Sequence, residues 1–266
     1  MEKSLKMASF IPLDSDLIKS NLKTNRIGKK VIVYKSTAST NDVARRYADG
    51  GEKNDGLAIF AEHQTGGKGR RGNEWFDEKS KSILSSILLF EHTIKPDMMA
   101  LIAAVAVAET IGKCRKNIAQ IKWPNDILVA DKKLCGILIE KKQKFYIIGI
   151  GINCHQQKTD FPAELADTAT SIDIQTSTIS DRNRIAKRLM FNFERCLEIA
   201  KENKDEIVEK WLDRSMLTGN RITVEHNGKQ FTGICLGVEP SQGLILQLER
   251  GGVKMFDAAS TSIVNY

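Results

Sequence analysis

The stretch of the sequence best suited to hold an anion is residues 66–75, which read GGKGRRGNEW. Its glycines let the backbone adopt positive φ and bring N–H groups close to a ligand, and Lys68, Arg70 and Arg71 add charge-assisted hydrogen bonds. The stretch is neither a Walker loop nor a dinucleotide fingerprint, because it lacks the Walker lysine-hydroxyl pair and leads into a strand rather than a helix. Taken alone, it fits a flexible basic turn, a phosphate loop or a nucleic-acid contact.

Three other segments place polar side chains beside turns or buried strands. STASTND (36–42) puts small hydroxyls and an amide at the start of a helix. KWPND (122–126) follows a lysine with a rigid turn that ends in an acid. KKLCGILIE (132–140) puts Lys133 at the mouth of a buried strand, where Gly136 permits close backbone approach. With GIGIN further along, these segments favour a binding site over a bare basic turn.

Apolar periodicity predicts the elements that position these segments. The predicted elements are a strand from Val31, a helix from Ser39 to the glycines 50 and 51, strands at 57–62 and 81–90, a buried helix at 97–112, three apolar runs between 120 and 154, and amphipathic helices from Arg184 and Asp205. The basic stretch therefore joins two strands. We expect an α+β fold, with a mixed β-sheet flanked by helices.

The character of the chain changes after residue 218. Short alternating strands follow, broken by glycines, and Asn227-Gly228 between apolar residues is a strong hairpin signal. We expect a small β-barrel here. The predicted division is an N-terminal segment (1–30), a main domain (31–218) and a C-terminal barrel (219–266).

Composition narrows the class of protein. The chain has 266 residues with a net charge of +7, which suits an anionic partner, although its basic residues are interleaved with acids. The most apolar run, 98–111, is shorter than the roughly 20 residues that span a bilayer, and the N-terminus lacks a secretory apolar stretch. Five widely spaced cysteines form no metal or redox motif. We therefore expect a cytoplasmic globular protein with free thiols and no metal site of its own.

Five motifs in order, STASTND, AEHQTGGKGRRGNEW, KWPNDILV, KKLCGILIE and GIGIN, resemble the biotin protein ligases, also called biotin–acetyl-CoA-carboxylase ligases. The resemblance runs from Val31 to Tyr266. It implies a class II synthetase-like catalytic domain with a C-terminal SH3-like barrel. It also implies that biotin and ATP, as its Mg²⁺ complex, give biotinyl-5′-AMP and pyrophosphate. The biotinyl group then passes to a lysine of a biotin carboxyl carrier domain.

The resemblance assigns roles to particular residues. The biotin-binding residues it implies are Ser39, Thr40, Asn41, Gln64, Lys68, Gly69, Arg70 and Lys133. Those it implies for ATP and the adenylate are Arg71, Trp75, Lys122, Asn125 and Asn153. The implied catalytic residues are Lys133, Arg70, Lys68 and Asp126, with Asp126 orienting or deprotonating the incoming lysine amine.

Each assignment has a simpler structural alternative. Ser39 and Thr40 could only cap a helix, and Gln64 could be an ordinary loop amide. Asp126 could cap its turn, and Trp75 could belong to the core. Lys133 could be a solvated turn lysine.

The sequence departs from the family pattern in two ways. Lys68 stands where the commonest form has arginine, so its charge remains but planar bidentate contact is lost. Only 38 residues precede Ser39, so we expect a monofunctional ligase without a helix-turn-helix repressor domain and without sequence-specific DNA binding. The sequence is compatible with either a monomer or a homodimer. The alternatives are a lipoate or octanoate ligase or transferase of the same fold and, from another class, a nucleic-acid-binding module.

Overall fold

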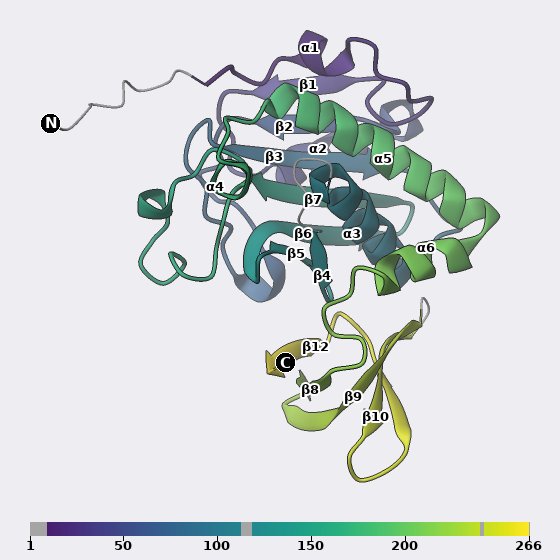
Figure 1. Ribbon diagram of the computed structural model, residues 1–266. Coiled ribbons are helices and arrows are strands. Elements are labelled where there is room, and N and C mark those ends of the chain that lie inside the picture. The colour runs from purple at the N-terminus through teal and green to yellow at the C-terminus, as the bar shows by residue number, and fades with distance from the viewer. Residues whose placement is uncertain (1–9, 113–118, 240–241, 266) are drawn as a thin grey trace, which may run out of the picture.

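A seven-stranded mixed sheet forms the main body of the protein (Figure 1). The computed structural model describes residues 10–112, 119–239 and 242–265. Two predictions concern residues outside these ranges. They are the absence of a signal peptide at the N-terminus and the free thiol of Cys114. The strands are β1 (Val31–Tyr34), β2 (Ala58–Ala61), β3 (Ser82–Leu89), β4 (Gln120–Lys122), β5 (Asp126–Val129), β6 (Lys132–Lys142) and β7 (Phe145–Asn153). Their order is β1-β2-β3-β7-β6-β5-β4, with β1 and β2 parallel and the other neighbours antiparallel.

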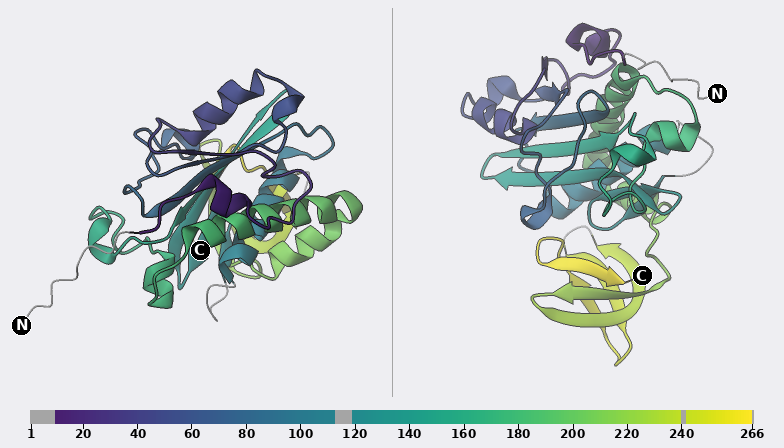
Figure 2. Two further views of the ribbon diagram at one scale, coloured as in Figure 1. Left: turned by 90° about the horizontal axis from the view of Figure 1, so that it is seen from above. Right: turned by 90° about the vertical axis from the view of Figure 1, so that its left-hand side faces the viewer.

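Helices cover both faces of this sheet (Figures 1 and 2). Alternate residues of a strand face opposite sides, so Ile59 packs in a cluster with α2, whereas its neighbours Ala58 and Phe60 join the larger core with α3 and α5. The helices are α1 (Ser15–Lys19), α2 (Thr40–Ala48), α3 (Pro96–Gly112), α4 (Ile172–Thr176), α5 (Arg182–Glu202) and α6 (Lys204–Leu212). Short 3-10 turns occur at Glu52–Asn54, Arg70–Gly72 and Lys158–Asp160.

Local signals account for where the long helices begin. Asp181 accepts a hydrogen bond from the Arg184 N–H at the start of α5, and Asn203 accepts one from the Asp205 N–H at the start of α6. The two amphipathic helices therefore start two residues and one residue before the predicted positions. The predicted buried helix at 97–112 is confirmed as α3.

A second, five-stranded antiparallel sheet follows α6 and lies below the main body (Figure 1). Its strands are β8 (Arg221–His226), β9 (Lys229–Glu239), β10 (Gly243–Leu248), β11 (Val253–Phe256) and β12 (Thr261–Asn265). The predicted hairpin at Asn227-Gly228 is confirmed, since both residues have positive φ, as a tight β8–β9 turn requires. The sheet order runs from β11 to β12, and among the described residues these two end strands are not paired, so the predicted small β-sheet domain is present without closure of the barrel by hydrogen bonds. The domain limits stay a prediction.

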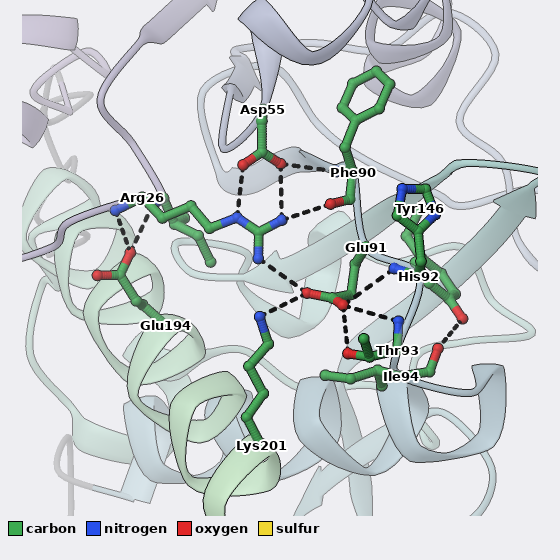
Figure 3. A network of polar contacts seen from close by, with 11 residues as sticks. Arg26, Asp55, Phe90, Glu91, His92, Thr93, Ile94, Tyr146, Glu194 and Lys201 are labelled. Atoms are coloured by element: carbon green, nitrogen blue, oxygen red, sulfur yellow. Dashed lines mark hydrogen bonds and ion pairs between the residues drawn. The ribbon is translucent and has the colours of Figure 1, made fainter.

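A polar network fastens the segment before β1 to the main body (Figure 3). Arg26 donates to Asp55 Oδ2 at 2.7 Å and to Glu91 Oε2 at 3.1 Å. Lys201 Nζ of α5 lies 2.8 Å from the same Glu91 oxygen, and Glu194 of α5 accepts the Arg26 N–H at 2.9 Å. The network therefore joins the N-terminal segment, the β3–α3 connection and α5.

Within the described ranges, none of the helices is both long enough and apolar enough to cross a membrane. Four cysteines lie in the described ranges, and all four are buried and outside any disulfide: Cys135, Cys154, Cys196 and Cys235.

Candidate active site

A cavity of about 300 Å³ opens where the start of α2, the basic loop and strands β5, β6 and β7 meet. It gathers segments that are far apart in the sequence. The sequence-predicted residues that line it are Ser39, Thr40, Asn41, Gln64, Lys68, Gly69, Arg70, Arg71, Trp75, Asn125, Asp126 and Lys133. The other two, Lys122 and Asn153, lie outside this cavity.

Hydroxyl and amide groups form one wall of the cavity. Thr40 donates through its backbone N–H and its hydroxyl to Gln64 Oε1, at 2.7 and 3.0 Å. The hydroxyl of Ser86, on β3, lies 2.7 Å from Thr40 Oγ1 and 2.6 Å from Asn41 Oδ1. Ser39 occupies the N-cap position of α2, but its side chain makes no capping bond. Helix capping therefore does not explain the Ser39 hydroxyl, which lines the cavity.

Three glycines make room for the larger side chains. Gly136 of β6 and Gly151 of β7 are register partners, and the Trp75 ring lies against both. A Cβ atom would lie 2.7 Å from Trp75 Cζ3 at Gly136, and 2.6 Å from Trp75 Cε2 at Gly151. At Gly149, a Cβ atom would lie 2.5 Å from Asn41 Oδ1. The indole Nε1 of Trp75 is buried and has no hydrogen-bond partner within the described ranges.

Lys133 brings a positive charge to the cavity beside an acid. Its Nζ lies 2.8 Å from Asp126 Oδ1 and 5.7 Å from the centroid of the Trp75 ring. The Lys133 side chain is 40% exposed and that of Asp126 is 24% exposed, so the pair remains open to a ligand. Asp126 is paired in the sheet with Gly136, which keeps its carboxylate next to the glycine pair.

The basic loop closes one side of the cavity, and its cations differ in their surroundings. Arg70 NH1 donates to Asn125 Oδ1 at 3.2 Å, and NH2 donates to the carbonyl oxygen of Ala258. Burial, followed by the neighbouring charge of Arg71, lowers the pKa of Arg70, although a guanidinium remains protonated at neutral pH. Lys68 Nζ forms an ion pair with Asp42 Oδ1 at 2.6 Å. Lys68 and Arg71 are both exposed.

A neighbouring cavity of about 290 Å³ shares Trp75, Asp126 and Lys133 with the first one. Both predicted residues missing from the first cavity line this one. The Asn153 amide donates to the Thr170 carbonyl oxygen at 3.0 Å, so at least one of its N–H groups serves the fold. Lys133 thus stands at the junction of two cavities.

Known proteins are similar to this chain over the segments that form these cavities. A family model described as the biotin/lipoate A/B protein ligase family matches residues 33–156. The bifunctional ligase/repressor BirA of Bacillus subtilis is 30% identical over 259 residues, which cover 92% of this chain and 78% of that protein. The biotin–[acetyl-CoA-carboxylase] ligase of Mycobacterium tuberculosis is 30% identical over 246 residues, which cover 89% of this chain and 91% of that protein. The chain belongs to the biotin protein ligase family.

Solved structures of biotin protein ligases share the fold. The biotin protein ligase from Aquifex aeolicus in complex with biotin and ATP is similar with a TM-score of 0.79 and 25% identity, covering 90% of this chain and 100% of that chain. The similarity extends over both sheets, because it covers most of the described residues.

Several residues that line the two cavities are not among those predicted from the sequence. Ser85 lines the first cavity from β3, where its hydroxyl interrupts the apolar run SILSSILL. Ser262 lines the first cavity from the C-terminal sheet, and Phe161 lines the second from a loop after β7. Neither of these two carries a local signal, because each reaches its cavity only through the folding of distant segments.

Proposed function

We propose that this protein is an ATP-dependent ligase that activates biotin as biotinyl-5′-AMP and transfers it to a lysine of a biotin carboxyl carrier domain. The observation that carries the proposal is the pair of adjoining cavities with Lys133 at their junction. One cavity has a wall of hydroxyl and amide groups, which suits the ureido ring of biotin because that ring offers N–H donors and a carbonyl acceptor. The other holds Trp75, Phe161 and Asn153, which suit a purine ring.

In the first reaction, a biotin carboxylate oxygen attacks the α-phosphorus of ATP. An acyl-phosphate bond forms and the bond to the β-phosphate breaks, so pyrophosphate leaves. Two anions approach each other and negative charge builds on the α-phosphate, so fixed cations at that point lower the barrier. Lys133 and Arg70 border the cavity where these groups would meet. Lys133 therefore has the position of the main electrostatic catalyst.

In this proposal, Mg²⁺ is bound mainly by the substrate ATP rather than by side chains of the protein. Among the described residues, no group of three or more His, Cys, Asp or Glu side chains could hold a metal ion. Glu74 and Asp126 are the carboxylates that line both cavities. Mg²⁺ would therefore enter bound to ATP, mainly through phosphate oxygens, with at most one or two carboxylates from the chain.

In the second reaction, a neutral lysine amine of the carrier attacks the acyl carbonyl, an amide bond forms and AMP leaves. Asp126 can accept the proton that the amine loses, because its carboxylate lies at the same junction. The loop 66–75 lies over the first cavity and would limit access of water to the mixed anhydride.

The proposal is tested by incubating the protein with biotin, Mg-ATP and a biotin carboxyl carrier domain, and measuring biotin on the carrier by mass spectrometry. Lys133→Ala should lower the rate of adenylate formation by about 100-fold or more, as loss of a transition-state donor does. Lys132→Ala is the matched control, because Lys132 lines neither cavity. Failure of the wild-type protein to label any biotin carrier would overturn the proposal.

The nearest alternative substrate is lipoate or octanoate, which the matching family model also includes. Biotin is favoured by the polar wall formed by Ser39, Thr40 and Gln64, because a lipoyl chain needs a longer apolar slot. Calorimetric titration with each acid separates the two. A nucleic-acid-binding module gains no support from the site, and the cytoplasmic location and a homodimer stay predictions.

A further inference from the structure

Three distant parts of the chain meet around the guanidinium of Arg70. The basic loop supplies Arg70 itself, the turn before β5 supplies the Asn125 side chain, and the β11–β12 turn supplies the carbonyl of Ala258. Among these contacts, the one to Ala258 joins the basic loop to the second sheet. Arg70 is thus held by a backbone group whose position depends on the C-terminal sheet.

The Ala258 peptide is itself held from the other side. Asp97, in the first turn of α3, has its carboxylate beside this peptide, and the nearby Ala258 N–H is one of the groups that favour its charged form. Arg70, Asp97, Asn125 and Ala258 also line one cavity of about 690 Å³, which the basic loop borders. Asp97 therefore fixes the strand-to-strand turn whose carbonyl receives Arg70.

The turn is also braced internally. Asp257 Oδ1 accepts the Ser260 N–H at 2.9 Å, and Asp257 Oδ2 accepts the Ser260 hydroxyl. Side chains of this type at the first position of a turn fix its backbone. His226, on β8, adds a contact from its Nδ1 to Thr261 Oγ1 at 2.9 Å.

We propose that Asp97 and Asp257 are positioning residues for Arg70, acting through the Ala258 peptide so that the guanidinium is held over the ligand cavity before ligand binds. The inference rests on the proposed function, because Arg70 is taken to act on the adenylate. Neither acid needs to touch the substrate. Each determines where an acceptor for Arg70 lies, and an unanchored arginine would spread over many rotamers.

The chemistry indicates that a hydrogen-bond acceptor matters at position 97 more than a negative charge. Burial, followed by repulsion from Asp257, raises the pKa of Asp97, so the ionised form is disfavoured there. An asparagine keeps an oxygen that can accept the Ala258 N–H and removes the charge. Asp97→Asn should therefore preserve the position of Arg70, whereas Asp97→Ala should not.

The test uses two measurements on the full-length protein. Hydrogen exchange of the peptide covering residues 66–75 is measured without ligand, and the release of preformed biotinyl-5′-AMP is measured in the absence of carrier. Loss of one hydrogen bond corresponds to about a fivefold change in an equilibrium. We expect Asp97→Ala to speed both loop exchange and adenylate release by about fivefold, with Asp97→Asn close to wild type. Asp49→Ala, which removes an exposed acid at the far end of α2, is the matched control.

Two outcomes would overturn the inference: Asp97→Ala leaving both rates unchanged, or Asp97→Asn raising them as much as alanine does. If Asp97→Ala does not fold, Asp257→Ala is the second variant, and it should speed loop exchange and adenylate release in the same way, because the Ser260 N–H and hydroxyl both lose their acceptor. An Arg70→Ala background supplies a further check, because Asp97→Ala should add nothing to adenylate release there. Loop exchange needs neither biotin nor ATP. A wild-type protein that forms no adenylate would therefore refute the proposed function while leaving the positioning of Arg70 separately testable.

Discussion

At the scale of single residues, the site depends as much on glycines, which leave room for their neighbours, as on charged side chains. The indole of Trp75 can lie on the sheet only because Gly136 and Gly151 are directly paired beneath it. Lys133 then reaches both the indole face and Asp126. A glycine in a strand interior often marks such a close approach.

Adding one methyl group at this point tests the importance of the Trp75 position. In Gly151→Ala, the new Cβ would lie 2.6 Å from Trp75 Cε2, so the indole must shift into the cavity. We expect the biotin dissociation constant to rise by about tenfold or more, as overpacking typically costs 1–3 kcal/mol. Calorimetric titration measures it, and Gly112→Ala, with open space around the added atom, is the control. Unchanged biotin affinity in Gly151→Ala would contradict this account of the cavity floor.

At the scale of elements, buried acids join segments that the sheet does not connect. Glu91 is the clearest case, because one carboxylate receives Arg26 from the N-terminal segment, Lys201 from α5 and the Thr93 backbone and hydroxyl. Although its burial acts in the opposite direction, the hydrogen bonds from Lys201, Thr93 and Arg26 hold the pKa of Glu91 well below its usual range. The charged form of Glu91 is therefore the one that stabilises the fold.

This direction of shift predicts how stability depends on pH. A depressed carboxyl pKa contributes stability that is complete above the unfolded-state pKa of about 4.3 and is lost as the pH falls toward the folded-state pKa. At pH 7, Glu91→Gln should lower the free energy of unfolding by about 2 kcal/mol, because Arg26 and Lys201 lose their charged partner. Urea unfolding measures this difference, which should shrink as the pH is lowered below about 4. Glu52→Gln, on an exposed 3-10 turn, is the control. A difference that stays constant with pH would argue against this role of Glu91.

At the scale of the whole molecule, the two sheets share one apolar core. A single cluster contains Ile121 of the main sheet, Trp211 of α6, and Ile222, Cys235 and Phe256 of the second sheet. Leu217, in the connection, belongs to the same cluster and is fully buried. We therefore expect the second sheet to unfold together with the main body.

Two buried thiols can measure this cooperativity. Burial raises the pKa of Cys196 to about 12 and that of Cys235 to about 11, so both should resist alkylation at pH 8. With one cooperative unit, both thiols should be labelled at the same slow rate, set by global unfolding. Peptide mass spectrometry after timed iodoacetamide treatment measures each rate, and protein in urea gives the fully reactive control. Faster labelling of Cys235 than of Cys196 would mean that the second sheet opens on its own.

Local residue patterns predict the kinds of secondary-structure elements and the chemical groups that they carry. The apolar run LAIFA predicts a strand, Asn227-Gly228 predicts a tight hairpin, and cations among glycines suit an anion-binding loop, because these properties depend on neighbouring residues alone. The family resemblance assigned roles to 14 residues, and 12 of them line the first cavity. The specific roles assigned to those residues stay predictions.

Which of these groups meet depends on the folding of the whole chain. The contact of Arg70 with Ala258, the seat of Trp75 on paired glycines and the separation of Asn153 into a second cavity each join segments distant in the chain. A period of two residues states which face of a strand a side chain occupies, but not which strand or sheet lies beside it. The neighbours of each strand follow from packing over the whole chain. In this protein, that packing brings the basic loop, the start of α3 and the second sheet together around Arg70.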